Sequence, residues 1–217
     1  SRAGLDPALA DFVGGLGQIV AEAAADWTPD RLALTRLSVN AAAGVRLEGT
    51  GELTDRALAA KLTLNGLDLG TLPVADHFAG LIGSRDLALD LALNRVRFRN
   101  APPGSVNLDL RRERTSWRLS RLAVEGFGGV AVTGSGALLP EGGEISGRIR
   151  APRFEALAAL AGPVLPEGVR QALGRAGDGL ARLDANFRLT RVPSGETGVT
   201  VNGAAQAGRL SLDGRLD

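Results

Sequence analysis

The segment Asp86-Leu-Ala-Leu-Asp-Leu-Ala-Leu-Asn-Arg-Val-Arg-Phe98 alternates apolar residues with polar or small ones over nearly its whole length. In an extended chain Leu87, Leu89, Leu91 and Leu93 fall on one side, and the residues between them fall on the other. Alternation of period two over this length is typical of a β-strand with one apolar face and one solvated face. The segment therefore predicts a half-buried strand.

Further runs with the same alternation follow at once, separated by short connections that contain Gly, Pro or polar residues. Such connections favour antiparallel hairpins over crossovers, so we expect a consecutive antiparallel meander over Arg85–Leu139. One run changes phase between Leu119 and Leu122, which predicts a bulge near Ser120–Arg121. The runs are Ser105–Arg111, Trp117–Glu125 and Val130–Leu139, and the connections are Asn100–Gly104, Glu113–Ser116 and Gly126–Gly129.

The rest of the chain predicts more strands, with helices between some of them. Prolines followed by apolar residues at steps of three and four predict short helices over Pro73–Gly83 and Pro152–Gly162, with another turn of helix over Pro166–Ala176. The same spacing predicts a longer amphipathic helix over Leu5–Asp26. Strands are predicted over Leu32–Asn40, Ala42–Leu53, Arg56–Leu67, Gly143–Arg150, Leu180–Arg191, Val199–Asn202 and Ala204–Leu216.

These elements form a loose internal repeat of strand, proline-started helix, long strand and meander, over about residues 62–140 and 147–217. No low-complexity linker separates the units. We therefore expect an N-terminal helix and connection over residues 1–31, followed by one continuous region over residues 32–217. The expected fold is mainly β with short helices, a long twisted antiparallel meander curled into an open groove. A closed β-sandwich is the alternative.

The composition limits the class of partner. The chain has 217 residues, and its 25 basic and 24 acidic residues give a net charge of +1, which provides no long-range attraction to nucleic acid. The absence of cysteine excludes a disulfide framework and thiolate metal sites. Because methionine is absent and an alternating run is still open at Arg215–Asp217, we interpret the sequence as a fragment of a longer protein.

The candidate catalytic residues have simpler structural interpretations. His77 is the only histidine, and with no partner beyond the adjacent Asp76 it fits a helix histidine better than a catalytic or metal-binding one. Asp86 and Asp90 share a strand face, which suits the solvated side of the alternation better than a pair of catalytic carboxylates. The sequence contains no evident nucleophile–base set or cluster of metal ligands, so we expect no enzyme activity, no metal and no cofactor.

Two further motifs, one basic and one rich in glycine, also have simpler structural interpretations. The run Arg111–Arg114 with Trp117 and Arg118 mixes basic and aromatic residues, as sites for nucleic acid or lipid headgroups do. A solvated hairpin tip is favoured instead because the net charge is close to zero. The glycines of Gly126–Gly129 and Gly134–Gly136 match no phosphate-binding loop and indicate bulges or sharp curvature.

The apolar face of the meander remains as the candidate functional surface. The predicted helices are short and far apart, too few to cover every strand, and a large uncovered apolar face is usually a binding surface. Its aliphatic side chains suit a flexible acyl chain. The residues expected to line such a groove are Leu89, Leu91, Val106, Leu108, Leu119 and Val132.

The order of strands, helices and glycines resembles the AsmA-like family of bacterial envelope proteins, whose architecture is related to bridge-like lipid-transfer proteins with repeating β-grooves. The resemblance covers about residues 32–217. It is carried by Leu64–Leu69 before the Pro73 helix, by the strand Asp86–Arg97, and by the glycine-bearing runs Leu119–Gly129 and Val132–Leu138.

The resemblance implies a periplasmic body, an inner-membrane anchor outside this sequence, and a role in outer-membrane assembly or phospholipid movement. The implied partners are a phospholipid or other acyl-chain lipid, the inner membrane and other envelope proteins, and the family has no catalytic residues to carry over. Two other functions stay open. One is a non-enzymatic structural or protein-binding envelope module with a closed core, and the other is a polysaccharide-processing enzyme on a β scaffold.

Overall fold

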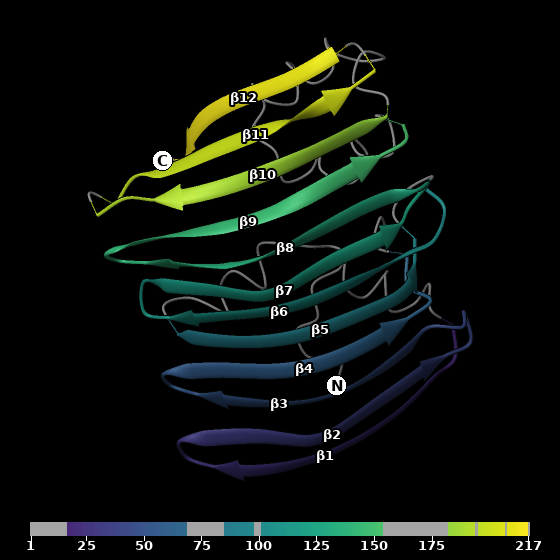
Figure 1. Cartoon of the computed structure of the whole chain (residues 1–217). Coiled ribbons are helices and arrows are strands. Elements are labelled where there is room, and N and C mark those ends of the chain that lie inside the picture. The colour runs from purple at the N-terminus through teal and green to yellow at the C-terminus, as the bar shows by residue number, and fades with distance from the viewer. Residues whose placement is uncertain are drawn as a thin grey trace.

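The computed structural model describes residues 17–68, 85–97, 101–153, 182–193, 195–206 and 208–216. Within these ranges the chain forms strands and turns and no α-helix. All the strands belong to one 12-stranded sheet, in which their spatial order follows their order in the chain (Figure 1). The strands are β1 (Ile19–Thr28), β2 (Arg31–Ala41), β3 (Arg46–Thr54), β4 (Ala57–Asn65), β5 (Asp86–Val96), β6 (Gly104–Glu113), β7 (Ser116–Gly126), β8 (Val130–Leu139), β9 (Gly142–Ala151), β10 (Leu183–Arg191), β11 (Thr197–Ala205) and β12 (Gly208–Leu216).

The predicted meander is confirmed. Strands β5 to β8 pair consecutively and antiparallel, and the register places Leu108 between Leu91 of β5 and Leu122 of β7. The predicted bulge is confirmed as well. Leu119 pairs with Leu110 and Arg121 pairs with Asp109, so Ser120 is the extra residue that shifts the apolar phase of β7.

The pairing of β4 with β5 departs from the predicted antiparallel pattern. These two strands run parallel, with Leu62 beside Leu91, while every other pair of neighbouring strands is antiparallel. A parallel pair requires a long crossover in place of a hairpin. The chain between the two strands, residues 66–85, is long enough for one, and alternation within each strand carries no information about its direction.

The helix predicted over Leu5–Asp26 is wrong in its C-terminal part, because Ile19–Thr28 forms β1 and pairs antiparallel with β2. Alanine favours helix, but pairing with an adjacent strand satisfies the same backbone groups and overrides that preference. Residues 1–16 lie outside the described residues. So do the helices predicted over Pro73–Gly83, Pro152–Gly162 and Pro166–Ala176, apart from Pro152 and Arg153.

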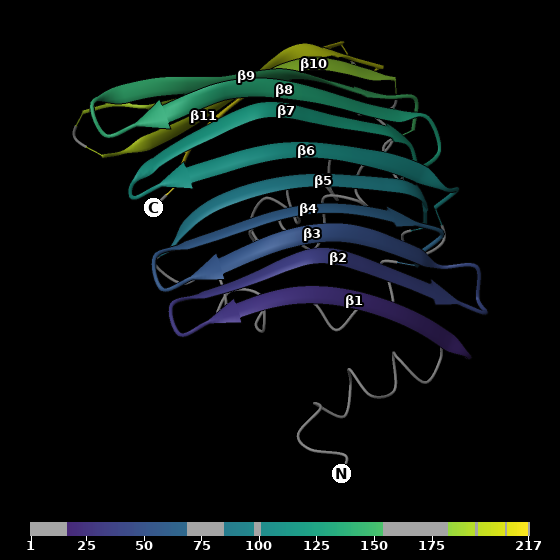
Figure 2. The same cartoon turned by 90° about the horizontal axis from the view of Figure 1, so that it is seen from below.

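The sheet is curved and open. Figure 2 shows the strands bowed in a common sense, so that the sheet forms an arch. Phe187 of β10 lies over Gly147 of β9 and reaches β8, where its Cζ is 3.0 Å from the place of a Cβ on Gly134. A side chain of β10 can touch β8 across β9 only on a concave face. Among the described strands, β1 and β12 each pair on one side only, so this concave face forms an open groove, as predicted, and not the closed sandwich.

We expect Gly147→Val to lower the free energy of unfolding by about 1–3 kcal/mol, the usual cost of overpacking. A Cβ at Gly147 would overlap both the carbonyl oxygen of Thr133 and the ring of Phe187. Gly214→Val is the matched control, since Gly214 lies on the same face with no atom within 4 Å of its Cβ position, and we expect a change below about 0.5 kcal/mol. Urea denaturation of both variants measures the difference, and equal effects would contradict the close approach of β8, β9 and β10.

Candidate functional site

The concave face of the sheet, called the groove from here on, is apolar from the first strand to the last. The register aligns its residues in rows that cross the strands. Leu, Val, Ile, Ala and Gly occupy nearly every position of these rows. Part of one row consists of Leu62, Leu91, Leu108 and Leu122. Part of a neighbouring row consists of Leu93, Val106, Val124, Val132 and Ile149.

The structure brings together the residues predicted to line the groove. Leu91 pairs directly with Leu108, and Leu89 lies one pair further along the same two strands. Leu119 is buried with 8% of its surface exposed, and the other predicted residues are half-buried. All of the predicted residues therefore lie on the concave side: Leu89, Leu91, Val106, Leu108, Leu119 and Val132.

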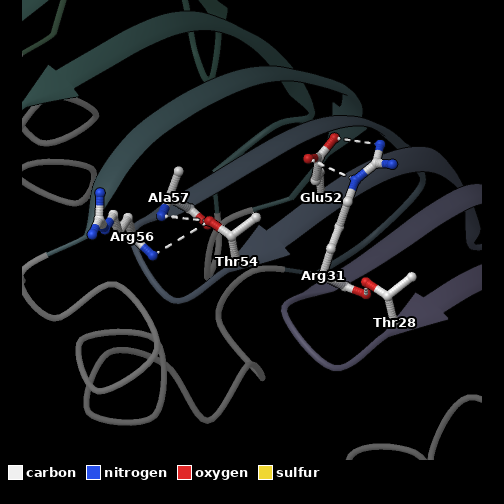
Figure 3. A network of polar contacts seen from close by, with 6 residues as sticks. All are labelled: Thr28, Arg31, Glu52, Thr54, Arg56 and Ala57. Atoms are coloured by element: carbon white, nitrogen blue, oxygen red, sulfur yellow. Dashed lines mark hydrogen bonds and ion pairs between the residues drawn. The ribbon is translucent and has the colours of Figure 1, made fainter.

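The convex face carries the ion pairs between neighbouring strands. Arg31 of β2 donates from Nε and Nη2 to the two carboxylate oxygens of Glu52 of β3, at 2.8 and 2.9 Å (Figure 3). This hydrogen bond holds the pKa of Glu52 below its ordinary value. In the next turn the Thr54 hydroxyl accepts the backbone N–H groups of Arg56 and Ala57, at 3.3 and 2.9 Å (Figure 3). Pairs this exposed add little stability, but they complete a polar outer surface.

Further ion pairs between neighbouring strands lie on the convex face, both near the C-terminal end of the sheet and on β5. Arg148 binds Asp184 through two hydrogen bonds of 2.6 Å, and these hold the pKa of Asp184 below its ordinary value. On β5, Asp90 pairs with Lys61 at 3.0 Å, and Asp86 accepts the backbone N–H of Arg114 at 2.7 Å. The prediction that Asp86 and Asp90 belong to the solvated side is thus confirmed.

One margin of the groove is closed by buried side chains. Phe127, in the turn between β7 and β8, is 1% exposed and packs with Val96 and Leu67. A second cluster of Val130, Ala151, Leu183 and Ala185 continues this margin. The glycines of Gly126–Gly129 do provide the predicted sharp turn, but sequence analysis missed the role of Phe127, whose only signal is an aromatic residue between glycines.

The opposite margin of the groove carries its charged residues. The register places Arg112 of β6 and Arg191 of β10 on the concave face, opposite Trp117 and Gly143 respectively. The Arg112 guanidinium carbon lies 5.4 Å from the centre of the Trp117 ring, which is a cation–π contact. Arg191 donates to the carbonyl oxygen of Thr115, in the β6–β7 turn, at 3.1 Å.

The prediction of a solvated hairpin tip at this margin is confirmed for only part of the basic run. Arg111, Arg114 and Arg118 are exposed. Arg112 and Trp117 are half-buried, and their strand positions turn them into the groove. The tip is therefore solvated on its convex side only.

Asp86 and Asp90, considered in the sequence as a possible carboxylate pair, are each engaged in the contacts given above. Within the part of the chain that the structure describes, no three His, Cys, Asp or Glu side chains lie close enough together to hold a metal ion. His77 is outside it. The described residues also contain no helix of the length and apolarity that crossing a membrane requires.

Comparison with known proteins gives no relative. No family model, no curated protein and no solved structure matches this chain. The described strands define a class by geometry alone, one open, curved β-sheet with a largely apolar concave face and a charged convex face. The resemblance to the AsmA-like family stays a prediction.

Proposed function

We propose that the groove binds the acyl chains of phospholipids or other lipids and shields them from water, without a catalytic step. In this proposal the chain is the periplasmic part of an AsmA-like protein that acts in outer-membrane assembly or phospholipid transport, anchored to the inner membrane by a segment outside this sequence. The observation that carries the proposal is the continuity of the apolar concave face across all 12 strands.

The dimensions of the sheet support this function. Strands spaced by about 4.8 Å make the groove roughly 50 Å long, and strands of about ten residues make it roughly 33 Å wide before curvature. Each methylene group removed from water contributes about 0.8 kcal/mol, so a chain lying in the groove is stabilised along its length. Away from the margin that carries Arg112 and Arg191, the aliphatic walls of the groove fit acyl chains of many conformations.

The distribution of charge also supports binding over a purely structural role. Ionised groups of the sheet form ion pairs on the convex face, which make that face polar toward water. These pairs are Arg31–Glu52, Lys61–Asp90 and Arg148–Asp184. The structural alternative requires a closed core, and the described strands form one open sheet. A polysaccharide-processing enzyme would need free carboxylates in a cleft, and Asp86 and Asp90 instead bind the backbone N–H of Arg114 and the ammonium group of Lys61.

Native mass spectrometry of the purified protein tests the proposal. We expect peaks displaced from the protein mass by the masses of phospholipids, and we expect these lipids to be recovered by extraction and identified from their fragments. A protein that carries no lipid after gentle purification, and that takes up none from phospholipid micelles, would contradict the proposal.

A further inference from the structure

The positive charges of the groove gather at one hairpin. Among the strand positions that the structure describes on the concave face, Arg112 and Arg191 are the charged residues, and none is acidic. Arg112 stacks on Trp117 of this hairpin, and Arg191 reaches from β10 to the carbonyl oxygen of Thr115 at its tip. Arg112 also donates from Nη2 to the carbonyl oxygen of Arg85. Both arginines thus contact this hairpin, although they are far apart in the sequence.

Arg191 differs from the arginine on the opposite face of the same strand. Arg188 pairs with the Glu144 carboxylate at 3.2 Å. Arg191 donates to a neutral carbonyl, and its Nε atom is shielded from solvent without a hydrogen-bond partner. An arginine keeps its charge in any protein environment, and a shielded charge is stabilised when an anion approaches it. The end of the groove at this hairpin is therefore chemically suited to an anion.

We infer that Arg112 and Arg191 bind the phosphate of an anionic lipid headgroup at the β6–β7 end of the groove. The inference rests on the proposed function, because the same lipid's acyl chains would lie along the rows that begin at Leu110 and Leu119. The planar fork of arginine matches phosphate oxygens. Trp117 lies between the charged margin and the apolar rows, a place that suits an amphipathic ring.

Fluorescence titration of Trp117 tests the site. The background is Trp27→Phe, because Trp27 is 82% exposed on the far edge strand and its replacement leaves Trp117 as the single tryptophan. The probes are dihexanoylphosphatidic acid, dihexanoylglycerol and inorganic phosphate. We expect the phosphatidic acid to bind about tenfold more tightly than the uncharged glycerolipid, as one charged hydrogen bond provides, and inorganic phosphate to bind most weakly because it has no acyl chains.

Two substitutions and a matched control locate the effect. Arg112→Gln and Arg191→Gln should each reduce the affinity for phosphatidic acid toward that for dihexanoylglycerol. Arg188→Gln removes the same charge from the other face of β10 and should keep the tenfold preference. Arg191→Lys, which keeps the charge, should keep part of the preference even if a glutamine variant does not fold, and circular dichroism identifies the folded variants.

The possible results separate the headgroup site from the proposed function. Equal affinity of the wild-type protein for both lipids overturns the headgroup site and leaves acyl-chain binding intact, whereas binding of neither lipid overturns both. Inorganic phosphate that binds as tightly as phosphatidic acid would show a site for free anions and overturn the lipid assignment. Loss of the preference in Arg188→Gln would show a general charge effect and overturn the assignment to Arg112 and Arg191.

Discussion

Leu108→Asp is expected to fold and to lose lipid binding. Leu108 is half-buried at the centre of the groove, between Leu91 and Leu122. A carboxylate there keeps part of its hydration in the free protein, so we expect the free energy of unfolding to fall by about 1–2 kcal/mol, close to the loss of leucine burial. In the lipid complex the same carboxylate would be buried without a partner, and we expect at least a tenfold loss of affinity, or about 1.4 kcal/mol.

The control for Leu108→Asp is Asn107→Asp, which adds the same charge at the adjacent residue on the convex face. We expect this variant to bind lipid as the wild-type protein does. Circular dichroism and native mass spectrometry with added phospholipid measure folding and binding. An unfolded Leu108→Asp protein would indicate that the groove is a closed core, and a folded variant with unchanged binding would place the lipid elsewhere.

Phe127→Ala should produce the largest loss of stability, because Phe127 is 1% exposed and fills the margin of the groove with Val96 and Leu67. Truncation of a buried phenylalanine costs about 3–5 kcal/mol through lost burial and the cavity that remains. Trp27→Ala removes a larger aromatic side chain that is 82% exposed, and we expect a change within about 0.5 kcal/mol. Urea denaturation compares the two. Similar losses in both variants would show that Phe127 does not anchor the margin.

The fold was largely predictable because its strands have one wet face and one apolar face. The alternation of β5 located its concave side, and the phase change in β7 located the bulge at Ser120. Strand direction has no such local signature, so the parallel pairing of β4 with β5 was missed. The alanine-rich sequence of β1 favours a helix, and this segment forms a strand because it pairs with β2.

The candidate site was predictable in its apolar part and not in its charged part. Extending the alternation of β6 and β10 by one step places Arg112 and Arg191 on the concave face. Their convergence on the β6–β7 hairpin depends on the curvature of the whole sheet, which no local pattern contains. Phe127 was missed for a related reason, since the turn that points it into the groove has a left-handed backbone at this residue, with φ of 47°.

The most direct test of lipid binding in the groove is site-specific photocross-linking with a photoreactive amino acid at Leu108 or at Asn107. The two residues are neighbours in β6 and their side chains lie on opposite faces of the sheet. Comparing them therefore tests which face binds lipid at one place along the strand. After irradiation with phospholipid, mass spectrometry should find the lipid attached at position 108 and absent from position 107. Equal labelling of both positions, or labelling at position 107 alone, would contradict the assignment of the concave face as the lipid-binding surface.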